Sequence, residues 1–202
     1  MVDRAADRLR EAVPGLLARP EPTRVPDDAI RRRAAVTLVL SPNPRRNSAA
    51  EALLVLRAEV DGDPWSGHVA LPGGTVEAGD ADLLHTAIRE LEEETGVTVP
   101  RQDYLGQLDE IHTRSPHLPS IAVTPFVAWL AERTPVVENE ELAGHLWVPL
   151  SDLESPARRS RFRREKPVAK WFETIDVRDV TIWGMTLSII DNFLDRISAN
   201  AS

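Results

Sequence analysis

A glycine-rich turn that leads into an acidic, helix-like run constrains this chain more than any other segment. From Gly74 to Gly96 the sequence reads GTVEAGDADLLHTAIRELEEETG. Apolar residues recur in it with helical spacing and would form one face of an amphipathic helix. They are Leu83, Leu84, Ala87, Ile88 and Leu91. We therefore expect a helix over about 81–95, with Asp80 or Asp82 as its N-cap and Gly96 at its C-terminal end.

The same helix carries a cluster of acidic side chains. Glu90, Glu93 and Glu94 stand three and four positions apart, so they share one helical face. Like charges at this spacing repel by roughly 0.2–0.5 kcal/mol per pair. A hard divalent cation reverses that sign, because it binds carboxylates and keeps positions for substrate phosphates. The alternative is a solvated acidic surface, but the adjoining glycines and Arg89 favour a magnesium-dependent site for phosphate chemistry.

Composition excludes several other kinds of chemistry. The 202 residues include no cysteine, which excludes disulfides, thiolate catalysis and zinc–sulfur sites. The net charge of −8 disfavours general binding to nucleic-acid backbones. No apolar run is long enough to span a membrane, and the charged N-terminal segment lacks the apolar part of a secretory signal. We therefore expect a cytoplasmic protein that does not enter a membrane.

Strand-like and helix-like segments alternate irregularly along the chain. The segments with a strand pattern are 33–41, 52–57, 104–112, 121–131, 145–149 and two short runs within 168–183. Besides the acidic helix, the segments with a helical pattern are 3–18, 150–154 and 186–198. The segment 19–30, with its prolines, is expected to be a linker or arm. This irregular order predicts an α/β fold in which helices cover a mixed β-sheet.

The 74–96 segment resembles the signature of the Nudix hydrolase family. That signature is a glycine, five residues, an acidic residue, a spacer, and then Arg-Glu-apolar-X-Glu-Glu-X-Gly-apolar. Here Gly74 is followed after five residues by Asp80, and the second part reads Arg89-Glu90-Leu91-Glu92-Glu93-Glu94-Thr95-Gly96-Val97. The departures are Asp80 in place of Glu and a spacer of eight residues in place of seven. The resemblance implies a helix–mixed β-sheet–helix sandwich and metal-dependent hydrolysis of a pyrophosphate linked to a nucleoside.

A second pattern lies just upstream. Leu53-Leu54-Val55-Leu56-Arg57-Ala58, followed by Gly67 and by Leu71-Pro72-Gly73-Gly74, is similar to the element that precedes the signature in coenzyme A pyrophosphatases. The run Ile182-Trp183-Gly184-Met185-Thr186 also resembles that subfamily. Three positions depart from its pattern, with Val55, Asp63 and Leu71 in place of Thr, Arg and Phe. This resemblance implies coenzyme A or an acyl-CoA as the leading substrate.

The resemblance also suggests how the chain is divided. We expect an N-terminal helix and arm over 1–33 and a Nudix core over 34–150 that carries the catalytic helix 81–95. A C-terminal extension over 151–202 would pack on that core. Because Nudix proteins often dimerise, the segments outside the core could mediate a homodimer.

The family resemblance assigns the metal site to the signature itself. It implies that Glu90, Glu93 and Glu94 bind Mg²⁺ or Mn²⁺, with Glu90 and Glu93 central to catalysis. Gly73 would add its carbonyl group to the metal ligands. Gly74, like Gly73, would let the backbone approach the substrate closely.

Catalysis also needs a residue that orients the carboxylates and a general base. Arg89 would pair with a carboxylate and orient it. Asp80 is expected to cap the helix rather than to bind the metal. The base can come from the signature or from a later acidic loop, which contains Glu138, Glu140 and Glu141. We choose Glu141 among them, the alternative being an ordinary acidic loop before a strand.

Substrate contacts are expected around the glycine turn. Arg57, at a strand end, either contacts a substrate phosphate or forms a structural salt bridge. His68 lies just before the turn and is expected to be structural or to lie at the rim of the site. Trp65, in a polar loop, is the best candidate for stacking on a base. His112 and His117 are further candidates for lining the pocket.

A strongly basic stretch covers 157–166. It could hold the additional phosphate of coenzyme A or contact RNA, but a solvated basic loop is the simpler interpretation. Its basic residues are Arg158, Arg159, Arg161, Arg163, Arg164 and Lys166.

The leading prediction is therefore a metal-dependent pyrophosphohydrolase that acts on a small nucleotide substrate. Nucleoside triphosphates, nucleotide sugars, NADH and ADP-ribose are alternative substrates for the same chemistry. RNA decapping through 157–166 is a further possibility, although the negative charge of the chain disfavours nucleic acid. The alternative of another class is a non-catalytic Nudix-like nucleotide-binding module. The intact carboxylate set argues against it, because a pure binder has no reason to keep repelling charges together.

Overall fold

The structure is a computed structural model that describes residues 4–45, 48–113, 119–164 and 169–199. Its main sheet is built from β1 (Arg32–Pro42), β2 (Ala50–Arg57), β3 (Val69–Ala70), β4 (Gly73–Thr75), β5 (Tyr104–Gln107), β6 (Ile111–His112), β7 (Ile121–Trp129) and β8 (Leu142–Pro149). A smaller sheet contains β9 (Arg159–Arg164), β10 (Lys170–Val177) and β11 (Val180–Trp183). The helices are α1 (Arg4–Leu17), α2 (Leu83–Thr95), α3 (Leu150–Glu154) and α4 (Gly184–Ser198). Short 3₁₀ turns occur at Asp27–Ala29, Arg101–Asp103 and Pro156–Arg158.

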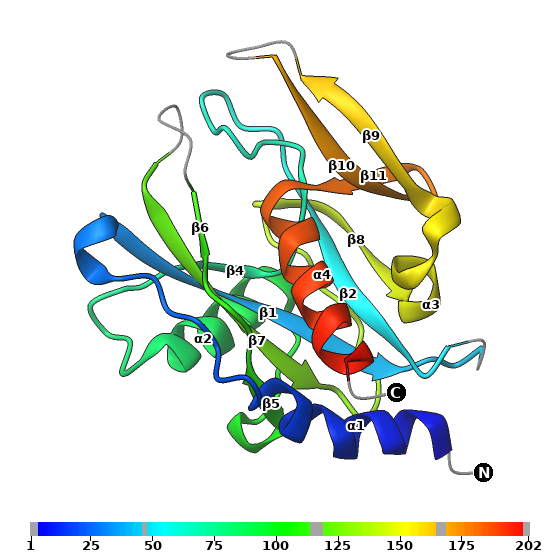
Figure 1. Ribbon diagram of the computed structural model, residues 1–202. Coiled ribbons are helices and arrows are strands. Elements are labelled where there is room, and N and C mark those ends of the chain that lie inside the picture. Colours follow the sequence, from blue (N-terminus) through cyan, green and yellow to red (C-terminus); the bar gives the residue numbers. More distant parts are fainter. Residues whose placement is uncertain (1–3, 46–47, 114–118, 165–168, 200–202) are drawn as a thin grey trace.

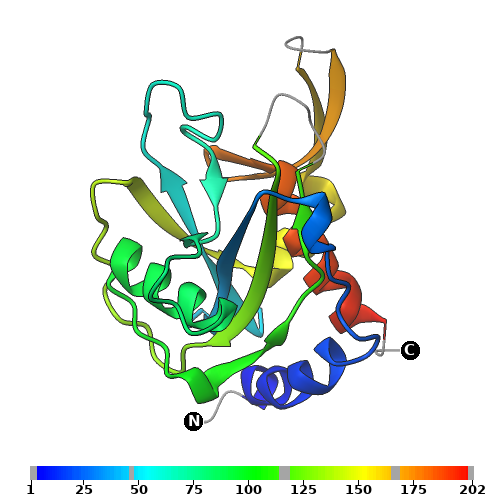
Figure 2. The same ribbon diagram turned by 90° about the vertical axis from the view of Figure 1, so that its left-hand side faces the viewer.

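The main sheet is mixed, as the sequence predicts. Five of its strands lie in the order β3-β2-β1-β7-β5 (Figure 1), and β4, β6 and β8 pair with β1, β7 and β2. The central pair β1–β7 is parallel, whereas the other pairs are antiparallel. Figure 2 shows α2 and α4 on opposite sides of this sheet. The fold is thus the helix–mixed sheet–helix sandwich that the resemblance implies.

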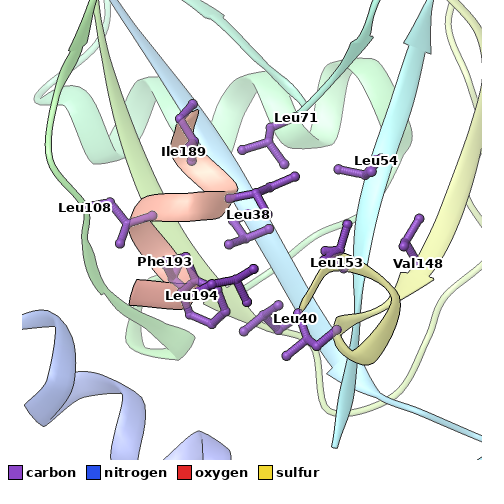
Figure 3. Packing of buried hydrophobic residues seen from close by; sticks show 14 of the residues in the cluster. Leu38, Leu40, Leu54, Leu71, Leu108, Val148, Leu153, Ile189, Phe193 and Leu194 are labelled. Carbon is purple, nitrogen blue, oxygen red and sulfur yellow. The ribbon is translucent and has the colours of Figure 1, made fainter. Parts of the chain in front are cut away.

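Burial on both faces explains why the central strands are largely apolar. All positions of β7 are buried. In β1, successive side chains point to opposite faces, so Leu38 and Leu40 join the cluster that contains α4, while Val39 joins the cluster that contains Leu91 of α2. Figure 3 shows Leu38 and Leu40 in the same cluster as Phe193 and Leu194 of α4. Each such side chain contributes about 2 kcal/mol by leaving water.

The N-terminal arm is held against the sheet, rather than being a free linker. Asp109 accepts hydrogen bonds from the backbone N–H and the hydroxyl group of Thr23, at 2.6 and 2.8 Å. Glu110, which is buried, accepts from the backbone N–H of Val25 at 2.7 Å and pairs with Arg33 at 2.9 Å. Residues 19–30 therefore contain little regular structure but have defined partners.

Two expected segments differ in the structure. The strand expected over 104–112 is split into β5 and β6, with Gly106 at φ 156° and an irregular register where β5 pairs with β7. The break lets Asp109 and Glu110 turn toward the N-terminal arm. The basic loop expected over 157–166 contains a 3₁₀ turn and strand β9 instead, because β9 pairs with β10 through Phe162 and Phe172.

Among the described helices, none has the length and apolar character that crossing a membrane requires.

Candidate active site

Helix α2 begins and ends at well-formed caps. The Asp82 side chain accepts a hydrogen bond from the backbone N–H of His85 at 2.7 Å, so Asp82 is the N-cap. Gly96 closes the helix in the left-handed region at φ 66°, a conformation that glycine adopts without steric cost. Of the two N-cap candidates, the structure selects Asp82.

Asp80 has another role, and its expected function as the N-cap is wrong. Its side chain is 1% exposed and accepts hydrogen bonds from Arg89 Nε at 3.1 Å and Nη2 at 3.0 Å. The Thr86 hydroxyl and the backbone N–H of Glu77 also donate to it, at 2.8 and 2.9 Å. Arg89 contributes most to lowering the pKa of Asp80 far below its usual value, despite burial. This aspartate is therefore a charged, buried anchor for Arg89.

Arg89 joins that anchor to the carboxylates of the helix. Its Nη1 lies 3.0 Å from Glu90 Oε1 and 2.9 Å from Glu93 Oε2. Its Nη2 also donates to the carbonyl oxygen of Thr75 at 3.2 Å. The guanidinium is thus fixed on one side by Asp80 and the glycine turn, and it orients two acidic side chains on the other.

The glycine turn leaves no room for side chains. A Cβ atom on Gly73 would lie 2.3 Å from the carbonyl oxygen of Ala35, and Gly73 has φ 151°. A Cβ atom on Gly74 would lie 2.5 Å from the carboxyl carbon of Glu90. Gly73 donates its backbone N–H to Glu94 Oε2 at 2.9 Å. The two glycines therefore allow strand β4 to contact the acidic helix directly.

Two of the three expected metal ligands are withdrawn from water. Glu94 is 3% exposed, and burial raises its pKa to about 7, assisted by the charges of Glu90 and Glu141 and opposed by the Gly73 N–H. Burial also raises the pKa of Glu90, against the effect of Arg89. The Glu93 side chain is 56% exposed. Protonation is therefore easier at Glu94 than at an ordinary glutamate.

The acidic loop after β7 is tied to the end of α2. The backbone N–H of Asn139 donates to the carbonyl oxygen of Glu94 at 3.2 Å, and the carbonyl oxygen of Glu141 accepts from Ala58 at 2.8 Å. Of the three acidic candidates in this loop, Glu138 lies 2.6 Å from His145 Nδ1. Glu141 is the one whose charge raises the pKa of both Glu90 and Glu94.

Arg57 lies beside this carboxylate group but already has a partner. Its Nη2 is 2.8 Å from Asp63 Oδ2, and its positive charge lowers the pKa of Glu94. The Arg57 Nε atom is buried and has no hydrogen-bond partner among the described residues. Asp63 was not predicted to be this partner, although the sequence places its opposite charge in the loop that follows Arg57.

The aromatic candidates lie in packed surroundings. Trp65 is partly buried against the main core, and its backbone N–H donates to Asp63 at 3.0 Å. His68 lies 4.6 Å from the ring of Trp183, which also contacts Phe162 and Phe172. Stacking of Trp65 on a base therefore stays a prediction.

The remaining candidates have partners of their own or lie outside the described residues. His112 Nε2 is 3.4 Å from the hydroxyl oxygen of Ser120, and His117 lies outside the described residues. In the described part of the basic stretch, ion pairs join Arg158 with Asp152, Arg159 with Asp191 and Arg161 with Glu173. Lys166 is likewise outside the described ranges.

The carboxylate oxygens are suitable ligands for a hard divalent cation, although in this structure they do not converge on one point. Within the described ranges, no three acidic or histidine side chains converge closely enough to hold a metal ion. Glu93 is turned toward Arg89, but its side chain is exposed and has room to rotate. The donor set of Glu90, Glu93 and Glu94 consists of oxygen atoms, which Mg²⁺ and Mn²⁺ prefer.

Comparison with known proteins agrees with this arrangement. The model of the NUDIX domain family matches residues 31–172. The uncharacterised Nudix hydrolase NudL of Yersinia pestis is 30% identical over 177 residues, covering 84% of this chain and 82% of that protein. An uncharacterised protein of Schizosaccharomyces pombe is 32% identical over 158 residues. That match covers 69% of this chain but about half of the yeast protein, at 48%.

Solved structures show the same fold. A MutT/nudix family protein from Enterococcus faecalis aligns with a TM-score of 0.63 at 20% identity, over 88% of this chain and 66% of that one. The MutT protein of Methanosarcina mazei aligns with a TM-score of 0.55 at 19% identity, over 87% of this chain and 99% of that one. Fold, signature and family match together show that the chain belongs to the Nudix family and is a hydrolase acting on phosphorus-containing anhydrides.

Proposed function

We propose that this protein is a Mg²⁺- or Mn²⁺-dependent pyrophosphohydrolase whose leading substrate is coenzyme A or an acyl-CoA. The observation that carries the proposal is the close approach of Glu90 and Glu94 to the glycine turn, where burial raises the pKa of both. Glu90, Glu93, Glu94 and the carbonyl group of Gly73 would hold the metal. A bound divalent cation supplies charge neutralisation for two phosphates and lowers the pKa of water.

The surrounding residues would position the reacting groups. Arg89 holds Glu90 and Glu93 through a guanidinium that Asp80 keeps in place. Glu141 would accept the proton of the attacking water. It is the acidic side chain of the later loop whose charge raises the pKa of both buried glutamates, Glu90 and Glu94.

The variant Glu141→Gln tests this assignment. We expect kcat to fall about a hundredfold, as for the loss of a general base. Glu140→Gln is the matched control, since Glu140 is the exposed neighbour in the same loop. Equal rates for the two variants would remove Glu141 from the proton transfer.

The choice of coenzyme A is supported by the position of the upstream pattern. In this pattern, the positive charge of Arg57 lowers the pKa of Glu94. The glycines of the pattern form the turn that contacts Glu90 and Glu94. Asp63 stands where the pattern has Arg, and it pairs with Arg57. A substrate phosphate would therefore compete with Asp63 for this arginine.

The decisive experiment is hydrolysis of a substrate panel by the pure protein with Mg²⁺ or Mn²⁺. The panel contains coenzyme A, acetyl-CoA, NADH, ADP-ribose, a nucleotide sugar and deoxynucleoside triphosphates, with products identified by mass spectrometry. We expect a phosphopantetheine and adenosine 3′,5′-bisphosphate from coenzyme A. Turnover of another substrate without any turnover of coenzyme A would overturn the substrate choice. Binding without turnover across the panel would indicate a non-catalytic module.

A further inference from the structure

A cavity of about 310 Å³ lies near the start of β2 and the middle of β8. Its lining joins segments that are far apart in the sequence. The residues used below are Arg45 after β1, Glu51 in β2, Arg133 after β7, His145 and Trp147 in β8, and Arg178 between β10 and β11. Glu51 and Arg57 are separated along β2 by roughly 20 Å. The arginines of the cavity, which gather around Glu51 and Trp147, therefore lie apart from the proposed metal site.

Arg133 is the best-defined group in this cavity. It forms an ion pair with Glu51, which is buried, and its Cζ atom lies 4.6 Å from the ring centre of Trp147. The Nε atom of Arg133 is buried and has no hydrogen-bond partner among the described residues. The guanidinium is thus held in one plane by the indole ring while one of its donor groups stays unused.

Two further arginines leave the lining with excess positive charge. In the described part of the chain, neither Arg45 nor Arg178 forms an ion pair, and Arg178 Nη2 donates to the carbonyl oxygen of Trp147 at 3.2 Å. Arg178 is also a non-glycine residue with positive φ, at 53°, in the turn that brings it there. Burial lowers the pKa of Arg133, and the nearby charge of Arg45 lowers it further.

The charges in the cavity do not balance. Glu51 neutralises one of the three guanidinium groups, and His145 is hydrogen-bonded to Glu138. An anion with several acceptor oxygens would satisfy the free donors and relieve the repulsion between the arginines. The volume is at the lower end of those of small-molecule sites, so it suits a compact ligand.

We propose that this cavity is a second ligand site, which binds the phosphate group of a small molecule through Arg45, Arg133 and Arg178. The proposal does not rest on the metal site or on the hydrolase activity. The ligand is either free phosphate or the phosphate monoester of a nucleotide, and both share the chemistry that three arginines recognise. A purely structural role for the Arg133–Glu51 pair would explain neither of the other two arginines.

Calorimetric titration of the metal-free protein in chloride buffer with EDTA tests the proposal. Inorganic phosphate and adenosine 3′,5′-bisphosphate are titrated separately, because without metal the carboxylate site repels both. We expect millimolar or tighter binding that weakens at least tenfold in the double variant Arg45→Gln/Arg178→Gln. Arg133 is left unchanged, since removing it would leave buried Glu51 unpaired. Arg8→Gln, on the exposed side of α1, is the matched control and should bind like the unchanged protein.

Each outcome has a definite meaning. Tighter binding of the bisphosphate than of phosphate, lost in the double variant, identifies a nucleotide site. Equal binding of the two, lost in the same variant, identifies a site for the phosphate group alone. No binding by the unchanged protein, or equal binding by the double variant and the control, overturns the proposal. Circular dichroism of the variants checks that they are folded.

Discussion

Asp80 illustrates how one buried residue can position the charged residues around it. A buried carboxylate is costly unless hydrogen bonds and a counter-charge compensate it, and Asp80 receives both from Arg89. The pKa of Asp80 is held far below its usual value, so the pair stays ionised at neutral pH. Arg89 can therefore orient Glu90 and Glu93 without losing its own position.

Replacing Asp80 by Asn should reveal this positioning role. The variant keeps the shape of the side chain but removes its charge, so we expect kcat to fall by roughly ten- to a hundredfold, as for other residues that orient metal ligands. Asp82→Asn is the matched control, because asparagine caps a helix as well as aspartate does. Steady-state kinetics at saturating Mg²⁺ compare the two. A hydrolysis rate in Asp80→Asn equal to that of the control would contradict the role.

Glu93 gives a second test at the level of single residues. Glu93→Gln keeps the length of the side chain but removes a charge from the proposed metal site, and we expect hydrolysis to slow on the order of a hundredfold. Stability in metal-free buffer should hardly change, because the side chain is exposed. Glu92→Gln, one position earlier and also exposed, should retain full activity. Unchanged turnover in Glu93→Gln would exclude Glu93 from the site.

At the level of elements, strand β4 connects the sheet to the acidic helix through two glycines with different functions. Gly73→Ala should destabilise the fold by about 3 kcal/mol, because its Cβ atom would meet backbone atoms of Ala35 and Val36 in a strained conformation. Gly74→Ala should destabilise the fold less than Gly73→Ala does. Because its Cβ atom would displace the Glu90 carboxylate, we expect a large fall in kcat with only a small fall in Tm.

Thermal unfolding and kinetics, measured on the same preparations, separate the two effects. Gly79→Ala is the control, since no atom lies within 4 Å of its added Cβ position. A loss of activity in Gly74→Ala that is matched by an equal loss of folded protein would show that Gly74 serves the fold alone.

Helices and strands with strong periodicity were predictable from the sequence. The acidic helix, the central strands and the closing helix lie close to their expected positions, because each has an apolar pattern that burial explains. Strand β9 was missed, since alternating arginines hide the single apolar residue, Phe162, that packs on β10. Local patterns identify elements that bury a complete face, but not short strands in a small sheet.

The candidate site was likewise predictable only in part. The signature gave the acidic residues and the glycines together with their spacing, and the structure brings them into contact. The pairing of Arg89 with Asp80 and of Arg57 with Asp63 was not predicted, because these two aspartates meet the arginines only when the turns before α2 and after β2 are folded. Pairing across a loop depends on backbone geometry that one sequence does not reveal.

At the level of the whole molecule, the N-terminal arm, the main sheet and α4 meet at one carboxylate. Asp109, between β5 and β6, accepts hydrogen bonds from Thr23 of the arm and from Asn192 and Arg196 of α4. Arg196 also donates to the backbone carbonyl oxygens of Leu17 and Pro20 at 2.9 and 2.7 Å. These contacts tie the N-terminal arm and α4 to the sheet.

This junction predicts a pH dependence of stability. Burial alone would raise the pKa of Asp109, but the hydrogen bonds from Thr23, Arg196 and Asn192 lower it from 3.8 to about 2. A carboxyl group whose pKa is lower in the folded state stabilises the protein above its unfolded-state pKa, and this contribution disappears as the pH falls from about 4 to about 2. It amounts to about 2 kcal/mol at neutral pH.

The variant Asp109→Asn should therefore be less stable than the unchanged protein by about 2 kcal/mol at pH 7, and the difference should shrink as the pH approaches 2. Urea unfolding at a series of pH values between 7 and 2 measures it. Asp61→Asn, in an exposed loop, is the control and should show no such trend. A constant difference between Asp109→Asn and the unchanged protein at all pH values would mean that the charge of Asp109 does not stabilise the junction. The N-terminal arm and α4 would then be held by packing and neutral hydrogen bonds, which do not titrate in this range.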